Sequence, residues 1–266
     1  MKLRPVRSRR DILLDDDSAR ARSSRKSEQA LERAMEKQVE RISDLQRVFY
    51  ADERYALLIV LQGRDASGKD GTIRKVFSAV NPQGCSVSSF KRPTDLELHH
   101  DYLWRVHRQV PARGMIGIFN RSHYEDVIVP VVAGALPKKT IRRRYAQIND
   151  FERMLTENAV VILKFFLHIS RDEQLERLRE RLENPAKNWK FNPGDLEDRK
   201  NWSRFTAAYD AMLEQTSTDH APWYIVPADD NDSRNYLVAR TIADTLEGLE
   251  LRYPKMDPAM RKVPMS

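Results

Sequence analysis

The sequence predicts an α/β fold in which a parallel, doubly wound β-sheet is covered by helices on both faces. Apolar runs of strand length alternate along the chain with segments whose apolar residues recur every three or four positions. The first such run, "ALLIVLQG", ends in glycine and is followed directly by a helical pattern. This alternation is typical of a three-layer αβα sandwich, which binds ligands beyond the carboxyl ends of its strands.

The periodicity places each element in order. Residues 27–50 predict an amphipathic helix with Ser27 as its N-cap, and 56–62 predict a fully buried strand. The remaining predictions are a helix from about Lys69 to Val80, a strand at 85–90, a helix at 96–110, a strand at 115–119, a helix at 139–157, a strand at 160–169, a helix at 171–183, a strand at 223–227 and a helix at 233–248.

Three segments do not follow this alternation. We expect residues 1–27 to form a basic, flexible, mostly solvated tail, and residues 251–266 a second tail. Residues 183–195 carry two prolines and a glycine between two charged helices, and loops of this kind are often functional. We therefore predict one domain at 28–250 with a lid at about 175–205.

Charge and composition limit the classes of partner. The net charge is +7, but the first 26 residues hold nine Lys/Arg against four Asp, a surplus of +5. The rest is close to neutral, which argues against a nucleic-acid-binding surface. The single Cys85 excludes an intramolecular disulfide, suits the cytoplasm and is expected to pack as a small apolar side chain. No apolar stretch has the length that a bilayer requires, so we predict no membrane partner.

Residues 63–70, "GRDASGKD", have the spacing of a Walker A phosphate loop in all but the last position. The glycines let backbone amides turn toward an anion, the following helix adds partial positive charge, and Lys69 adds a full charge. The alternative is a simple glycine turn with a solvated lysine. The predicted phosphate-binding residues of the loop are Gly63, Arg64, Ala66, Ser67, Gly68, Asp70 and Gly71.

Asp70 stands where ordinary phosphate loops carry a Ser or Thr that binds Mg²⁺. A carboxylate cannot reproduce the ligand geometry of that hydroxyl, but Asp65 offers a second carboxylate within the loop. We hypothesise that Asp65 binds the metal, directly or through water, and that Asp70 caps its helix.

A second cluster of polar residues follows the strand at 115–119. Asn120 and Arg121 come directly after it, with Glu125 and Asp126 about one helical turn later. Arg121 is predicted to clamp phosphate with its guanidinium fork. Glu125 or Asp126 could provide a further metal ligand, or both could simply favour the N-terminus of a short helix.

Basic residues gather in two further places. The segment "PKKTIRRRY" (137–145) holds five basic residues, and it is interpreted either as a guide for an anionic polymer or as a solvated face. Arg177 and Arg181 share one helical face, and Lys187 and Lys190 follow them, so this group could close over phosphates as a lid.

The segment between these clusters offers further candidates. Lys91 lies at a strand end and is a candidate phosphate contact. His100 and His107 lack partners at metal-ligand spacing, which argues against zinc. We expect Trp104 to lie in the core rather than to stack on a base.

Taken together, these motifs resemble the polyphosphate kinase type 2 family from about residue 28 to 250. The pieces that carry the resemblance are "QGRDASGKDGTIRKV", "NPQG", "SFKRPT", "HDYLWR", "FNRSHYEDV", "VVILKFFLHIS", "NPAKNWKFNPGD" and "APWYIVPAD". The strand-end sequence "NRS" and the loop sequence "GKDG" look like the branch that phosphorylates both nucleoside monophosphates and diphosphates.

The resemblance implies a P-loop kinase fold like that of thymidylate kinase, with a helical lid. It implies phosphoryl transfer between inorganic polyphosphate and adenine or guanine nucleotides, with Mg²⁺ or Mn²⁺, in a homodimer or homotetramer. It assigns catalytic roles to Asp65, Lys69, Arg121 and Arg181, places the family's acidic pair at Glu125 and Asp126, and places Lys190 and Asp195 in the lid. We expect Asp65 and Asp126 to bind the metal, and Asn120, Glu125 and Lys190 to contact the substrates. The alternatives are an ATP-dependent nucleoside monophosphate kinase and a non-catalytic polyanion-binding protein.

Overall fold

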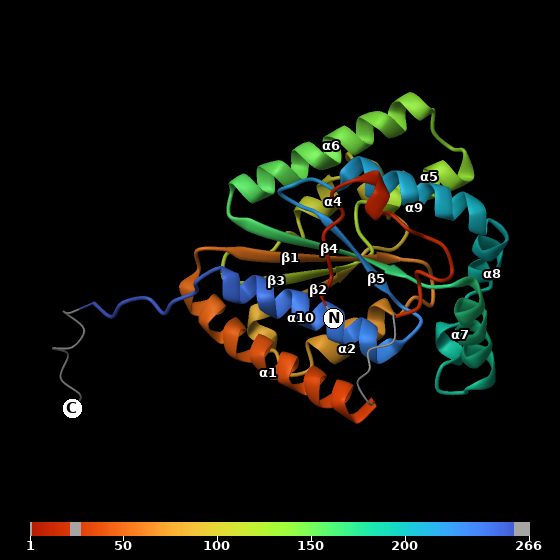
Figure 1. The fold of residues 1–266 in the computed structure, drawn as a ribbon. Coiled ribbons are helices and arrows are strands. Elements are labelled where there is room, and N and C mark those ends of the chain that lie inside the picture. Colours follow the sequence, from red (N-terminus) through yellow and green to blue (C-terminus); the bar gives the residue numbers. More distant parts are fainter. Residues whose placement is uncertain (1, 22–27, 258–266) are drawn as a thin grey trace.

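A five-stranded parallel sheet forms the centre of the protein (Figure 1). The structure, a computed structural model, describes residues 2–21 and 28–257. The strand order is β2-β3-β1-β4-β5, so the first strand lies in the middle. The chain runs from β1 to the edge strand β2, returns to β3, and then continues on the other side of β1 with β4 and β5. This confirms the predicted α/β class. The strands are β1 (Ala56–Gly63), β2 (Cys85–Ser89), β3 (Ile116–Asn120), β4 (Val160–His168) and β5 (Trp223–Pro227).

Helices cover both faces of the sheet, as the continuous apolar strands require. In Figure 1, α1 and α10 lie with α2 on one face, and α6 lies with α5 and α9 on the other. Each face has its own buried apolar cluster. The helices are α1 (Glu28–Asp52), α2 (Lys69–Val76), α3 (Asp95–Leu98), α4 (Trp104–His107), α5 (Glu125–Ala133), α6 (Lys138–Glu157), α7 (Arg171–Glu183), α8 (Pro193–Lys200), α9 (Trp202–Thr216) and α10 (Asn231–Gly248).

The single helix predicted at 96–110 is wrong, because this stretch holds two separate turns of helix, α3 and α4. Asp101 Oδ1 accepts hydrogen bonds from the backbone N–H groups of Leu103 and Trp104, and this local turn competes with a continuous helix. Trp104 is only half-buried and stacks on His100 with ring centres 3.9 Å apart. The expectation that Trp104 lies in the core is also wrong.

The expectation of a solvated N-terminal tail is wrong for residues 2–21. Val6, Ile12 and Ala19 are buried, and the Val6 N–H donates to the Trp223 carbonyl over 2.8 Å. The segment thereby covers the outer edge of β5, and a covered edge cannot pair with another chain. Ser27, the predicted N-cap, lies outside the described residues.

The proline-containing segment after α7 is short and partly ordered by its own turns. It contains one 3₁₀ turn (Asn188–Lys190) before α8 begins at Pro193.

Cys85 packs half-buried against the apolar cluster beneath α1, as predicted, and burial raises the pKa of its thiol to about 11. Within residues 2–21 and 28–257, no helix combines the length and apolar character needed to cross a membrane.

Candidate functional site

The phosphate loop has the backbone shape that its glycines allow. It leaves β1 at Gly63 and enters α2 at Lys69. Gly68 adopts φ of 97°, and a Cβ built there would approach Arg234 Nη1 to 2.2 Å. A side chain at this position is therefore strained, and it would have to displace the Arg234 guanidinium. Ala66 also has a positive φ of 63°, which adds to the curvature of the loop.

Lys69 crosses the loop and leaves part of its charge unneutralised. Its Nζ donates to the carbonyls of Gly63 and Arg64 over 2.7 and 3.0 Å, and the residue is only 8% exposed. An ammonium has three donors, so one remains for a ligand. Within the described residues, Lys69 forms no ion pair. Burial lowers the pKa of Lys69, whereas the charge of Asp65 opposes that shift.

Asp70 does not cap its helix. Gly68 is the N-cap and Asp70 lies inside the first turn, where its Oδ1 accepts a hydrogen bond from Asn120 Nδ2 over 2.6 Å. The capping prediction is wrong because the helix begins one residue before Asp70 and this carboxylate points to the end of β3. The contact ties the phosphate loop to the second strand end.

Asp65, Arg121 and Glu125 come together at the junction of β1 and β3. Arg121 Nη2 donates to Asp65 Oδ1 over 2.5 Å, and Nη1 lies 3.8 Å from Glu125 Oε2. Although burial raises the pKa of Asp65, Lys69 and Arg121 hold it below its usual value. Burial raises the pKa of Glu125, and this effect exceeds the opposing pull of Arg121 and Lys69.

Asp126 points elsewhere, to an ion pair with Arg105 at 3.4 Å. Its backbone carbonyl accepts a hydrogen bond from Arg144 Nη1 over 2.6 Å. The structure thus does not bring Asp126 to Asp65, although both were predicted as metal ligands. Among the described residues, no group of three His, Cys, Asp or Glu side chains has a metal-binding arrangement. Mg²⁺ is commonly held by one or two carboxylates together with water and substrate phosphates, and Asp65 and Glu125 suit that mode.

The predicted lid contributes a second paired arginine. Arg181 on α7 donates to Asp195 Oδ2 over 2.9 Å. Burial and the charge of Asp65 raise the pKa of Asp195 to about 6, against the opposing effect of Arg181. Lys190 Nζ lies 5.0 Å from the ring centre of Trp189, which is 78% exposed. The lid therefore presents both cationic and aromatic groups.

Two arginines donate hydrogen bonds to the phosphate loop and to the helix that follows it. Arg177, predicted as a lid residue, lines the same cavity as Arg181 and also donates to the carbonyls of Ala66 and Asp229 over 3.0 and 2.6 Å. Arg234 on α10 is 2% exposed and donates to Thr72 Oγ1 over 2.9 Å. The sequence interpretation missed Arg234. The available signal was its helical register with the buried Val238, because an arginine on an apolar face requires polar partners.

Arg64 and Ser67 both lie in the loop, but the Arg64 side chain points away from it, whereas the Ser67 hydroxyl is buried without a partner in the described residues. The Arg64 guanidinium stacks 3.7 Å from the ring centre of Trp202 and donates to Thr206 Oγ1 over 2.6 Å. It packs beneath α9, so Arg64 contributes only its backbone to the loop. Ser67 Oγ is buried and has no hydrogen-bond partner within the described part of the chain.

A cleft of about 1590 Å³ opens above the phosphate loop. Eleven Lys/Arg and six Asp/Glu line it, a surplus of five positive charges in a body that is otherwise close to neutral. The basic residues at the start of α6 are not part of this lining. The predicted residues that line the cleft are Asp65, Ala66, Gly68, Lys69, Asp70, Gly71, Lys91, Asn120, Arg121, Arg177, Arg181, Lys187 and Lys190.

A second pocket, of about 300 Å³, shares Asp65 and Arg121 with the cleft. It also includes Glu125 and the apolar or aromatic side chains of Val129, Phe205 and Tyr209, among others. Asp198, Asn201 and Arg204 also line this pocket, so its lining is mixed, and the two cavities meet at one carboxylate and one guanidinium.

Comparison with known proteins decides the family. Residues 24–254 match Polyphosphate kinase 2 (PPK2). This chain belongs to the polyphosphate kinase 2 family. The resemblance predicted from the motifs is confirmed, and the family match covers both the phosphate loop and the lid.

Several polyphosphate kinase 2 relatives are similar over most of their length. The chain is 54% identical to an AMP/ADP-polyphosphate phosphotransferase of Meiothermus ruber over 223 residues, which is 84% of each chain. It is 47% identical to an ADP-polyphosphate phosphotransferase of Rhodopseudomonas palustris, over 85% of this chain and 82% of the relative. The crystal structure of Polyphosphate Kinase 2 from Arthrobacter aurescens TC1 has a TM-score of 0.88 at 38% identity, covering 98% of this chain and 97% of that one.

Proposed function

We propose that the protein transfers a phosphoryl group between inorganic polyphosphate and a nucleotide with Mg²⁺, forming ADP and ATP, or GDP and GTP, from the monophosphates and diphosphates. The observation that carries this proposal is the junction of two cavities at Asp65 and Arg121. A transfer reaction between two substrates requires two sites whose reacting ends meet. The names of the Meiothermus ruber and Rhodopseudomonas palustris relatives support this substrate pair.

The large cleft suits polyphosphate. A polymer that carries charge on every unit requires an extended surface of positive charge, and the cleft has a surplus of five. Its basic residues come from α2, the loops after β2 and β3, the lid and α10, so they surround the phosphate loop on several sides. Lys69 and the loop amides then bind the phosphate that is transferred.

The smaller pocket suits the nucleoside of the acceptor. Val129, Phe205 and Tyr209 offer apolar and aromatic surface for a base. A base seated there directs the nucleotide's phosphate toward Arg121. The predicted preference for both monophosphate and diphosphate acceptors requires that one or two phosphates fit between this pocket and Lys69.

The reaction balances as an in-line displacement. An acceptor phosphate oxygen attacks the terminal phosphorus of polyphosphate, a new P–O bond forms, and the bond to the next phosphate breaks, so the polymer shortens by one unit. Lys69 and Arg121 neutralise charge on the transferring group, while Asp65 orients Arg121. When bound at Asp65 and Glu125, Mg²⁺ supplies further charge neutralisation. The protein needs no nucleophile of its own.

The direct test omits ATP. Purified protein is incubated with AMP or ADP, Mg²⁺ and polyphosphate, and the products are separated by chromatography. We expect ADP from AMP and ATP from ADP, and no product when EDTA is present. An ATP-dependent monophosphate kinase forms product only after ATP is added. A non-catalytic polyanion-binding protein forms none under either condition.

A pair of variants tests the assignment of the nucleoside pocket. Val129→Phe adds bulk to the pocket, and we expect the KM for nucleotide to rise about tenfold, because overpacking costs about 1–3 kcal/mol. The KM for polyphosphate should stay unchanged. Val131→Phe is the matched control, since Val131 is on the same helix and lines neither cavity. Equal effects of the two variants, or an effect on polyphosphate alone, would contradict the assignment.

A second pair tests the metal ligands. Asp65→Asn should raise the Mg²⁺ concentration for half-maximal rate by at least about tenfold, because a ligand carboxylate is lost. Asp126→Asn should change it little, since Asp126 pairs with Arg105. Should Asp126→Asn alone weaken the Mg²⁺ response, the metal belongs with Asp126 as the resemblance implied. The homo-oligomeric state and the cytoplasmic location stay predictions.

A further inference from the structure

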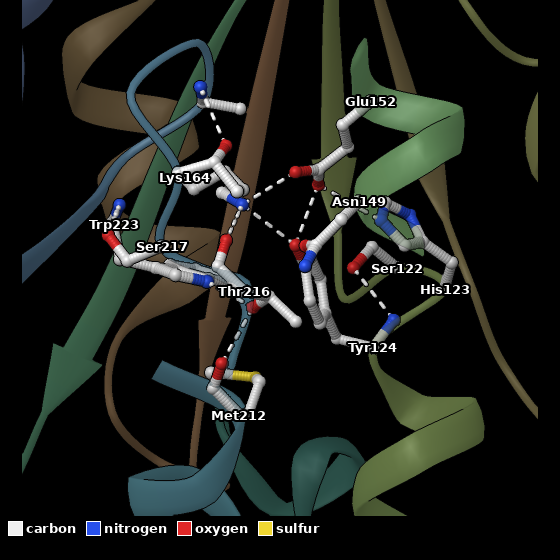
Figure 2. Close-up of polar contacts among 12 residues, drawn as sticks. Ser122, His123, Tyr124, Asn149, Glu152, Lys164, Met212, Thr216, Ser217 and Trp223 are labelled. Carbon is white, nitrogen blue, oxygen red and sulfur yellow. Dashed lines mark hydrogen bonds and ion pairs between the residues drawn. The ribbon is translucent and has the colours of Figure 1, made fainter. Parts of the chain in front are cut away.

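A buried polar network joins Lys164 and Glu152 to His123 and Tyr124, which lie between Arg121 and Glu125 in the sequence, in the turn that carries those two residues (Figure 2). Lys164 on β4 is 0% exposed and donates to Glu152 Oε2 over 2.6 Å and to Tyr124 Oη over 2.8 Å. Its third donor goes to the Thr216 carbonyl over 2.7 Å. All three ammonium donors are therefore used inside the protein.

Glu152 on α6 is the acceptor that joins this network to the turn. Its Oε1 accepts from the Tyr124 hydroxyl over 2.7 Å and lies 3.2 Å from His123 Nε2. His123 Nδ1 has no hydrogen-bond partner among the described residues, so Glu152 is the polar contact that orients the ring. Although burial raises the pKa of Glu152, Lys164 holds it below its usual value.

The network and the site share one short segment of backbone. Arg121 and Glu125 face the cavities, whereas His123 and Tyr124, between them in sequence, face Glu152. Arg121 adopts φ of 61°, in the left-handed region that a non-glycine residue enters only when its surroundings hold it there. A displaced Tyr124 would move both functional side chains within two or three residues.

Stability alone does not account for a buried ion pair at this place. A pair of apolar side chains of similar volume is often as stable as a buried pair of charges, because desolvation opposes the Coulomb attraction. The hydrogen bonds to the turn are what apolar side chains cannot replace.

We propose that Glu152 is a positioning residue, which fixes Arg121 for phosphoryl transfer by holding Tyr124 and His123, with Lys164 neutralising its charge. This inference rests on the proposed function. It assigns a functional consequence to residues that do not contact either cavity.

The first test replaces the ion pair by apolar side chains, Glu152→Leu with Lys164→Met. We expect a folded protein whose kcat falls about 10- to 100-fold while both KM values change less than about threefold, because a misplaced group weakens the transition state more than substrate binding. Ile42→Ala is the control: Ile42 is fully buried on the other face of the sheet, and its loss should lower the unfolding midpoint without changing kcat. A folded double variant with unchanged kcat overturns the proposal.

Two further measurements separate positioning from a general loss of structure. Tyr124→Phe removes one hydroxyl and should also lower kcat. This variant serves as the test if the double variant fails to fold. When the double variant or Tyr124→Phe is combined with Arg121→Lys, kcat should fall little further, because the guanidinium that the network positions is already absent. If the combined variant loses kcat by the full product of the separate fold losses, the network does not act through Arg121, and the proposal is overturned. Wild-type protein without polyphosphate-dependent turnover contradicts the proposed function instead, so the two failures are distinguishable.

Discussion

Lys69 and Lys164 are both buried lysines, but they use their charge in opposite ways. Lys69 is 8% exposed at the floor of the cleft and donates to two neutral carbonyls. Lys164 is 0% exposed and donates to a carboxylate, a hydroxyl and a carbonyl. Burial lowers the pKa of both side chains. The difference lies in the partners and not in the depth of burial.

The comparison shows how a protein separates a charge kept for a ligand from one used by the fold. A lysine with a spare donor and no carboxylate contact has a favourable interaction still to make, and an anion completes it. A lysine whose donors are all used gains nothing from a ligand. This difference predicts where each substitution should act.

Lys69→Met should give the largest effect, on rate. It removes a cation aimed at the transferring phosphate, and loss of one such group costs about 10²- to 10³-fold in kcat. The free energy of unfolding should change by no more than about 1–2 kcal/mol, since only two hydrogen bonds to carbonyls are lost. Initial rates with saturating polyphosphate and nucleotide, together with urea unfolding, measure both. A strongly destabilised but active variant would reverse the comparison.

Lys164→Met should give the larger effect on stability. It leaves Glu152 buried without its cation, and breaking a buried pair in this way costs about 3–5 kcal/mol. Urea unfolding of this variant beside Lys69→Met measures the difference directly. If the two variants lose the same stability, saturation of donors is not what distinguishes these lysines.

The features that the sequence predicts well are those that depend on local spacing. The phosphate loop is a contiguous motif between a buried strand and a helix, so Lys69 could be assigned without long-range information. Arg121 and Glu125 were predicted to follow the strand at 115–119, and folds of this class bind ligands beyond the carboxyl ends of their strands. The structure brings both residues to the phosphate loop, where Arg121 contacts Asp65 and Glu125. The alternation of strands and helices along the chain likewise predicted a sheet covered by helices on both faces.

The features that the sequence predicts poorly depend on contacts between distant segments. Lys164 lies in an apolar run whose spacing says nothing of Glu152 or Tyr124. The packing of residues 2–21 depends on the exposed edge of β5, which no local pattern reveals. The difference between Glu125 and Asp126, neighbours of equal charge, was set by the position of Arg105.

Arg181 combines features of the two lysines, because it lines the cleft as Lys69 does and contacts a carboxylate, Asp195, as Lys164 does. The pH dependence of stability tests this ion pair. Asp195 has a pKa of about 6 in the folded protein, raised from 3.8 chiefly by burial. The folded state therefore binds this proton more tightly than the unfolded state does. This contribution to stability is present below about pH 4 and is lost as the pH rises to about 6, by on the order of 1 kcal/mol after allowance for solvent screening.

Asp195→Asn should remove this contribution to the pH dependence. Urea unfolding at pH 4.5 and 6.5 gives the change in free energy for each protein, and the difference between wild type and variant isolates Asp195. Identical changes in the two proteins would mean that the carboxyl is better solvated than its burial indicates. A clear difference would show that the ionised Asp195 carboxylate, which pairs with Arg181, is destabilised by its burial. A substrate phosphate could then replace Asp195 as the partner of Arg181.

Lys190 and Lys139 extend the comparison to lysines at the surface, with the smallest expected effect. Lys190 lines the cleft, whereas Lys139, in the basic segment predicted as a polymer guide, does not. Lys190→Ala should raise the KM for polyphosphate about threefold for short and long chains alike, as loss of one solvated ion pair does. Lys139→Ala should leave both values unchanged if the cleft alone binds the polymer. A rise confined to long chains would show that the polymer continues past the cleft to α6, and location rather than pairing would then decide which exposed lysines serve the substrate.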